Sequence, residues 1–214
     1  MGILSNGLKL IHRLGLYETL LSRGSSNSNV VIRSIEGSVL GEQDVVGWAR
    51  EQTGFGLLRI KRTDLLDVLL DTVQRAGISI HYNKKLTSIE EGDEEVTAYF
   101  FDGTSETADL LLGCDGIHSS VRRLFVDPLQ APEYSGFAGL TALVPFSDLS
   151  ESAASCLKGI NPTLTEEGMF TTVSCTALDD EIYWVFSRQT PLPETRDIRD
   201  GWEIRRKDEV REFK

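Results

Sequence analysis

The sequence predicts an α/β protein in which helices alternate with short strands. Residues 108–125 read as a strand, a tight turn and the start of a helix. Residues 1–24 and 57–77 carry apolar residues at helical spacing. Residues 169–187 contain two runs rich in β-branched and aromatic residues around a polar turn, which is typical of antiparallel strands. These observations together favour a mixed fold over an all-helical or all-β one.

Composition and charge narrow the classes of function. The chain has 214 residues, 40% of them apolar and 26% charged, as in ordinary globular proteins. Its net charge of −11 argues against a nucleic-acid partner, because phosphate binding needs a basic face. No apolar run approaches the roughly 18 residues of a membrane span, and no secretory signal is visible. We therefore expect no membrane span and a cytoplasmic location.

The cysteines and histidines predict neither disulfides nor a metal site. Cys114, Cys156 and Cys175 are odd in number and widely spaced, which favours free thiols in a reducing compartment. The histidines are isolated from one another and from any pair of cysteines. Zinc sites need such residues in closely spaced sets, so no metal is expected.

The stretch 108–125 has the most informative pattern in the chain. The apolar and small residues at 110–114 predict a buried strand, and Asp-Gly at 115–116 marks a tight turn. Ser119 or Ser120 can cap the helix that follows. This turn lies where a strand ends and a helix begins. Unpaired backbone N–H groups and the helix dipole at such a position favour an anion or the polar edge of a cofactor.

The first 24 residues predict one amphipathic helix. Leu10, Leu14, Tyr17 and Leu21 recur at helical spacing and form its expected apolar face. Gly24 is a plausible C-terminal cap.

Residues 57–77 predict a second helix, capped by Thr63 and ended by Gly77. Arg62 immediately precedes the cap. The residues expected to form the apolar face of this helix are Leu65, Leu66, Leu69, Leu70 and Val73.

Several shorter segments complete the prediction. Asp-Gly at 102–103 predicts a hairpin turn, residues 147–167 read as loop or partial helix, and residues 207–213 as a helix. Gly-Phe-Gly at 54–56 is not a nucleotide loop, because Arg59 stands where the third glycine belongs. Strands are expected at 30–32, 78–80, 86–89, 96–101, 139–144, 169–177 and 181–187, with a weak strand near 45–46 and a further strand that runs from the 102–103 turn into 110–114.

The central stretch resembles the Asp-Gly motif of FAD-dependent aromatic-ring monooxygenases, the para-hydroxybenzoate and salicylate hydroxylase-like flavoproteins. Their pattern is a charged residue, two hydrophobic, two small, Asp-Gly, any, charged, Ser, any, hydrophobic and Arg. Leu110 departs from it, because a charged residue is usual there. The matching residues are Leu111, Leu112, Gly113, Cys114, Asp115, Gly116, His118, Ser119, Val121 and Arg122.

Two further segments extend the resemblance over roughly residues 3–125. Asn-Gly-Leu at 6–8 and Leu-Gly-Leu-Tyr at 14–17 resemble a segment that follows the family's dinucleotide fingerprint. Residues 62–66 resemble the family's arginine-plus-helix segment, in which the arginine lies beside the flavin. A planar guanidinium suits phosphate, ribose or isoalloxazine oxygens. The alternative for Arg62 is a surface arginine near a helix N-terminus.

The resemblance implies a fold, a cofactor and a set of site residues. The fold is a partial FAD/NAD(P)-binding Rossmann-like domain with an antiparallel β-meander at 1–125, and part of an antiparallel-sheet substrate domain at 126–214. FAD is the implied cofactor and NAD(P)H the co-substrate. Arg122 either serves this site or pairs on the surface, and no catalytic acid or base is assigned. The implied cofactor-binding residues are Arg62, Asp115, Gly116, Ser119 and Arg122.

Two family hallmarks are missing from the sequence. It contains no Gly-x-Gly-x-x-Gly after an N-terminal strand and no later Gly-Asp-Ala-Ala-His-type segment. We therefore expect a truncated FAD-dependent monooxygenase, which hydroxylates or epoxidises a small aromatic or polyketide/terpenoid-like substrate and holds FAD weakly or not at all. The alternative is a catalytically inactive fragment or interaction module that keeps part of the flavoprotein fold. The missing glycines also disfavour a nicotinamide-only oxidoreductase.

Overall fold

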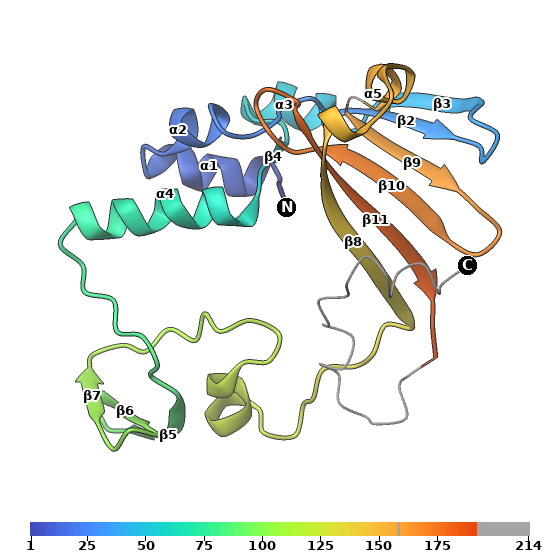
Figure 1. The fold of residues 1–214 in the computed structure, drawn as a ribbon. Helices are drawn as coiled ribbons and strands as arrows, with labels where there is room; N and C mark the ends of the chain where they lie inside the picture. The colour runs from blue at the N-terminus through green and yellow to red at the C-terminus, as the bar shows by residue number, and fades with distance from the viewer. Residues whose placement is uncertain (158, 192–214) are drawn as a thin grey trace. The chain divides into compact units, whose positions relative to one another are not determined.

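The computed structural model describes residues 1–157 and 159–191 (Figure 1). The chain forms two compact units, one built from residues 1–77 and 136 onward and the other from residues 78–135. The expected division at residue 125, into an FAD-binding part and a substrate part, separates the chain by expected role and not by contacts, and it stays a prediction.

A six-stranded mixed sheet forms the frame of the first unit (Figure 1). Its strand order is β3-β2-β9-β10-β11-β8, with every neighbouring pair antiparallel except β2 and β9, which are parallel. Segments far apart in the sequence therefore lie next to each other in one sheet. The strands are β2 (Asn29–Arg33), β3 (Val39–Asp44), β8 (Phe137–Pro145), β9 (Ile160–Leu164), β10 (Met169–Ser174) and β11 (Glu181–Gln189).

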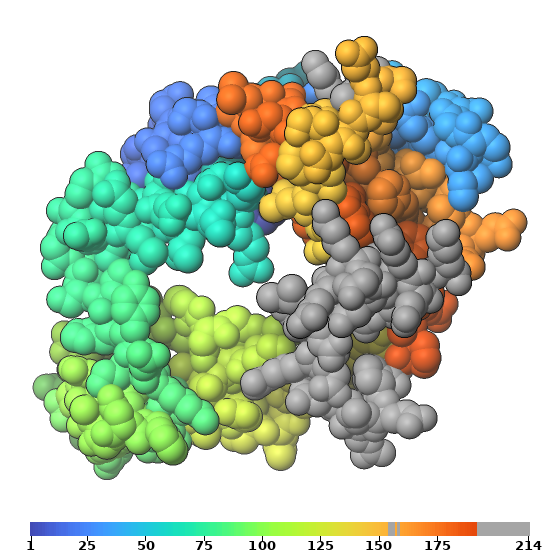
Figure 2. All heavy atoms as spheres, in the orientation of Figure 1, coloured from blue at the N-terminus to red at the C-terminus, as the bar shows by residue number. Residues whose placement is uncertain are grey.

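Helices and a two-stranded sheet complete this unit. β1 (Gly2–Ile3) pairs antiparallel with β4 (Leu58–Arg59). In the space-filling view, the blue surface of the α1–α2 segment adjoins the blue-green surface of α4 (Figure 2). None of the helices within the described ranges is long and apolar enough to cross a membrane. The helices are α1 (Ser5–Arg13), α2 (Tyr17–Leu21), α3 (Gly47–Thr53), α4 (Arg62–Arg75), the short 3-10 helix η2 (Phe146–Asp148) and α5 (Glu151–Cys156).

The predicted single N-terminal helix is wrong, because the segment breaks into α1 and α2. Gly15 lies between them with φ of 72°, a left-handed conformation that suits glycine and ends α1. The break changes the buried face, so Leu10 and Leu14 are exposed at 59% and 64%. Gly24 is not the helix cap either. The core cluster consists of Leu8, Leu16, Leu20, Leu58, Ile60 and Val68.

α4 begins one residue before its predicted cap. Lys61 is the N-cap residue and makes no side-chain capping bond, so Thr63 lies inside the first turn. Val68 is the buried residue of the helix, whereas Leu66 is exposed and Leu65 and Leu69 pack partly against the core. The predicted end is confirmed, because Gly77 follows the C-cap with φ of 69°.

The second unit contains a three-stranded antiparallel sheet of β5 (Leu86–Glu91), β6 (Val96–Phe100) and β7 (Ser105–Ala108). A hairpin turn at 102–103 joins β6 to β7, as predicted, with Gly103 at φ of 80°. The π-helical turn η1 (Arg122–Val126) contacts β5.

The predicted strands are only partly present. Those near 30–32, 86–89, 96–101, 139–144, 169–177 and 181–187 are confirmed, and β7 confirms a strand after the 102–103 turn. The weak strand predicted near 45–46 is displaced, because β3 ends at Asp44 and residues 45–46 form a turn. Residues 78–80 contain no strand, and β9 was not predicted. The strand predicted at 110–114 is also absent. Its backbone has no neighbouring strand among the described residues to satisfy its N–H and C=O groups, which a parallel-sheet strand requires. The helix expected at 207–213 lies outside the described residues.

Candidate functional site

The turn at 115–122 closes on itself through the Asp115 carboxylate. Its Oδ2 accepts hydrogen bonds from the backbone N–H of Ser120 at 2.5 Å and of Val121 at 3.3 Å. The Ser119 hydroxyl accepts one from the N–H of Arg122 at 2.9 Å, which confirms Ser119 as a capping residue. The expectation of free N–H groups at this position is therefore wrong, because these side chains occupy them.

The same contacts determine the charge of the turn. The hydrogen bond from the Ser119 hydroxyl lowers the pKa of Asp115 below its ordinary value; desolvation is the next largest effect and opposes it, and the N–H groups of Ser120 and Val121 lower the pKa further. Asp115 is therefore a carboxylate at neutral pH and repels a phosphate. Its remaining lone pairs can accept hydrogen bonds from ligand hydroxyl or N–H groups. The turn thus suits a ligand edge that donates hydrogen bonds.

Two glycines shape this turn. Gly116 has φ of 75°, and a methyl group added there meets no atom within 4 Å, so its exposed backbone is open to close approach by a ligand. Gly113 has a different role. A methyl group there would lie 2.9 Å from Cβ of Val121, so a small residue at 113 and a branched residue at 121 pack as a pair.

Arg122 turns back onto the same segment. Its Nη2 donates to the carbonyl of Ile117, while its Nε is buried without a hydrogen-bond partner among the described residues. No carboxylate in that part of the chain lies within ion-pair distance of the guanidinium. The alternative role of Arg122, an ion pair on the protein surface, is therefore not seen among the described residues. The structure thus gathers Asp115, Gly116, Ser119 and Arg122 in one turn. Their contact with a cofactor stays a prediction.

Arg62 lies in the other compact unit, as the first residue of α4. Its side chain is exposed, and its guanidinium makes no hydrogen bond or ion pair with any residue in 1–157 or 159–191. An arginine with all its donors free can bind a polar ligand without first breaking an internal bond.

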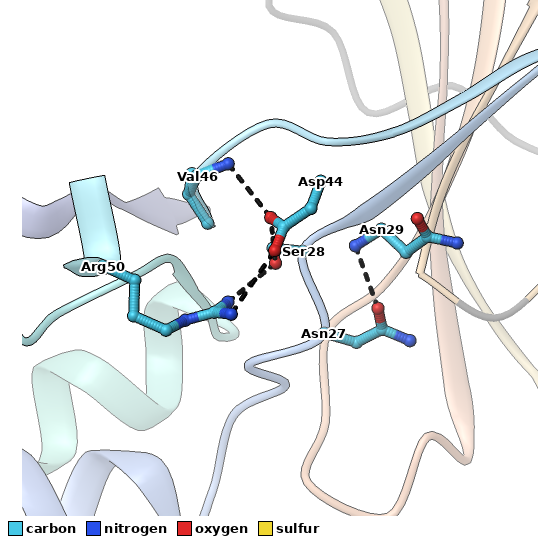
Figure 3. A network of polar contacts seen from close by, with 6 residues as sticks. All are labelled: Asn27, Ser28, Asn29, Asp44, Val46 and Arg50. Carbon is cyan, nitrogen blue, oxygen red and sulfur yellow. Dashed lines mark hydrogen bonds and ion pairs between the residues drawn. The ribbon is translucent and has the colours of Figure 1, made fainter. Parts of the chain in front are cut away.

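A polar network that the sequence analysis missed joins the residue before β2 to β3 and α3 (Figure 3). Ser28 donates to Asp44 at 2.7 Å, and Arg50 donates to Ser28 at 2.8 Å and pairs with Asp44 at 3.4 Å. The bond from Ser28, followed by that from the N–H of Val46, lowers the pKa of Asp44. An open hollow of about 330 Å³ lies beside it. The charged groups satisfy one another, so we interpret the network as an anchor for α3.

The comparisons with known proteins decide the family. A family model described as "FAD binding domain" matches residues 2–207. The chain belongs to this family. It is 28% identical over 212 residues to the 6-hydroxynicotinate 3-monooxygenase of Pseudomonas fluorescens, covering 97% of this chain and 52% of that protein. It is 32% identical over 143 residues to the 3-amino-4-hydroxybenzoate 2-monooxygenase of Streptomyces cremeus, covering 66% and 35%.

Solved structures confirm the fold class of this chain. Klebsiella pneumoniae HpxO, complexed with FAD and uric acid, aligns with a TM-score of 0.74 at 23% identity, over 90% of this chain and 48% of that one. CtdE, in complex with FAD and a substrate, also gives 0.74, at 17% identity. The chain spans about half the length of these relatives. The resemblance to the FAD-dependent monooxygenases is likewise confirmed.

The residues present fit part of what FAD requires. In the first unit, the Arg62 guanidinium, which is unpaired within the described part of the chain, suits an oxygen of the cofactor. In the second unit, taken by itself, the open backbone at Gly116 suits a polar edge of the cofactor. The N–H groups beside Asp115 do not suit the pyrophosphate, because they are already paired. The sequence also has no Gly-x-Gly-x-x-Gly loop that would cradle phosphates. The fit therefore covers hydroxyl, carbonyl and ring N–H groups of the cofactor.

Proposed function

We propose that this chain supplies the flavin-contacting arginine and the Asp-Gly turn of an FAD-dependent monooxygenase that uses NAD(P)H and O2. The observation that carries the proposal is the self-closed turn around Asp115, in a chain of the FAD-binding family, with its open glycine at 116. Relatives named for 6-hydroxynicotinate and 3-amino-4-hydroxybenzoate support a small aromatic substrate that carries a carboxylate and a hydroxyl.

The protein's share of the chemistry is binding and orientation. The chemistry that bound FAD would supply is the two-electron oxidation of NAD(P)H coupled to insertion of one oxygen atom of O2 into the substrate, with the other oxygen atom reduced to water. Arg62 would hold carbonyl or phosphate oxygens through its free donors. Asp115 would accept a hydrogen bond from a hydroxyl or ring N–H group, and Gly116 would allow close approach of the backbone. Arg122 and Ser119 would keep that turn in shape.

The test is flavin binding by the gene product expressed from its full reading frame. We expect a yellow protein, with NAD(P)H oxidation accelerated by a hydroxylated aromatic acid. Arg62→Ala should weaken FAD binding by about 10-fold or more, because a hydrogen bond to a charged group contributes roughly 1.5–3 kcal/mol. Arg75→Ala is the matched control, since Arg75 ends the same helix and pairs with Asp71 at 2.5 Å. A folded protein without flavin absorbance contradicts the proposal.

A catalytically inactive interaction module is the second candidate. The second unit exposes large apolar side chains, among them Phe101, Leu112 and, at 97%, Leu129. Exposed apolar surface of this kind often marks a protein contact. This candidate predicts a folded protein that binds no flavin and oxidises no NAD(P)H, so the same absorbance measurement separates it from the first.

A further inference from the structure

Two cations next to Arg62 reach the same hairpin of the large sheet. Lys61 Nζ lies 2.7 Å from Glu181 Oε2, and each of the two side chains is only 29% exposed. Arg59 Nη2 donates to Ser174 Oγ at 3.3 Å. Ser174 ends β10 and Glu181 begins β11. The segment before Arg62 is therefore tied to both strands of the β10–β11 hairpin.

The backbone explains why both cations point the same way. β4 ends at Arg59, and Lys61 is still extended, with φ of −63° and ψ of 141°. Residues two apart in an extended chain project to the same side. Lys61 is also the N-cap residue of α4, and its carbonyl accepts a hydrogen bond from the N–H of Leu65 at 3.2 Å. Holding Lys61 therefore fixes the point where α4 starts, one residue before Arg62.

Burying the charged side chain of Arg59 costs free energy of desolvation. It is 4% exposed, and its acceptors among the described residues are the hydroxyls of Ser25 at 3.0 Å and Ser174. Its Nε and Nη1 have no hydrogen-bond partner in that part of the chain. Burial lowers the pKa of Arg59 to about 10. An apolar side chain would fill this space without that penalty, so stability alone does not explain a cation here.

We propose that Lys61 and Glu181, supported by Arg59, are positioning residues that hold Arg62 in a fixed place relative to the β10–β11 hairpin. Among residues 1–157 and 159–191 the guanidinium of Arg62 has no hydrogen-bond or ion-pair partner to orient it, so its place there depends on the backbone that these residues hold. The inference rests on the proposed function, in which Arg62 contacts FAD. The inference adds that Lys61, Glu181 and Arg59 determine the geometry of that contact.

The test is a double-mutant cycle with Lys61→Met, Glu181→Gln and their combination, followed by the charge exchange Lys61→Glu with Glu181→Lys. The readouts are the FAD dissociation constant of the full gene product and, without FAD, the exchange rate of the Leu65 amide. Each single variant should weaken FAD binding about fivefold, which corresponds to ~1 kcal/mol. The double variant should be no weaker than either single one, and the charge exchange should restore most of the affinity.

Lys84→Met is the matched control, because Lys84 forms an ion pair of the same 2.7 Å length with Asp102 in the other unit. It should change neither readout. If Lys61→Met does not fold, both readouts are taken from the isosteric Glu181→Gln variant alone, and its FAD affinity tests the proposal.

The outcomes are distinguishable. Faster exchange at Leu65 with unchanged FAD affinity overturns the proposal, because the pair then only stabilises the helix start. Multiplying effects in the double variant also overturn it, since the two residues would act independently. If the unmodified protein binds no FAD, the proposed function fails first and this inference falls with it.

Discussion

The Asp115 carboxylate lies 2.5 Å from the backbone N–H of Ser120 and binds the next N–H, that of Val121, with the same oxygen. A negative side chain at the amino end of a helical segment is stabilised both by these bonds and by the dipoles of the peptide groups. Asp115 therefore serves the turn itself, whatever else the turn binds.

Replacing Asp115 should loosen the helical segment that follows it. Asp115→Ala removes both bonds, whereas Asp115→Asn keeps an acceptor oxygen but loses the charge. We expect amide exchange at Ser120 and Val121 to be fastest in the alanine variant, intermediate in the asparagine variant and slowest in the natural protein. Equal exchange rates in all three proteins would show that the Asp115 carboxylate does not protect these N–H groups.

The same residue should make the turn sensitive to acid. The folded-state pKa of Asp115 lies below its unfolded value, so the unfolded chain binds the proton more readily. The stabilisation is complete above the unfolded pKa of about 3.9 and is lost as the pH falls through the folded-state pKa. A carboxyl carbon titration by NMR should place the Asp115 midpoint below 3.9, and Asp115→Asn should remove the acid dependence of protection at Ser120.

Gly116 should tolerate a side chain poorly although there is room for it. An added methyl group meets no atom, so any cost of Gly116→Ala comes from the backbone at φ of 75°. That conformation costs an L-residue about 1–2 kcal/mol. Gly41→Ala is the control, because Gly41 also has open space but no positive φ, and it should change stability by less than ~0.5 kcal/mol. Hydrogen exchange gives the free energy of unfolding of each unit and so measures the effect of each substitution.

A side chain at position 113 should also destabilise the protein, but for the opposite reason, because there is no space for it. Gly113→Ala places a methyl group against Val121 and should cost about 1–3 kcal/mol, the usual range for overpacking. Combining it with Val121→Ala should recover part of that loss. A double variant as unstable as the sum of the two singles would argue against contact between these positions.

A comparison of two leucines tests the break between α1 and α2. Leu20 is fully buried, so Leu20→Ala should destabilise the first unit by about 2–5 kcal/mol. Leu10 was predicted to be in the core but is mostly exposed, so Leu10→Ala should change stability by less than ~0.5 kcal/mol. Urea unfolding followed by tryptophan fluorescence measures the loss of stability in both variants. Similar losses of stability in the two variants would show that Leu10 is buried like Leu20, as the single-helix prediction requires.

Local patterns predicted the turns and helix ends more reliably than the buried faces. Asp-Gly at 102–103 and Gly77 were found as predicted, because turn and cap geometry depends on the residues themselves. The face of the first helix was wrong, since periodicity alone does not reveal that Gly15 interrupts the helix. β9 was missed because Asn161 and Pro162 do not read as strand residues, and its pairing with β2 and β10 comes from distant sequence.

The candidate site was predicted as a set of residues but not as a set of contacts. The motif correctly places Asp115, Ser119 and Arg122 in one turn. It does not show that the Asp115 carboxylate occupies the N–H groups expected to receive a ligand. Neither the Lys61–Glu181 pair nor the burial of Arg59 has a local sequence signature, because Glu181 and Ser174 lie more than a hundred residues away and Ser25 lies 34 residues away.

The place of β2 between β3 and β9 has a consequence for how the protein is made on the ribosome. β2 and β3 emerge early and can pair as a hairpin, but the other edge of β2, with Val30, Val31 and Ile32, stays open until residues 160–164 have been synthesised. An apolar strand edge left unpaired during translation is prone to associate with other nascent chains. Slow elongation beyond residue 33 should therefore increase aggregation of this protein, and a chaperone that covers that edge should reduce it.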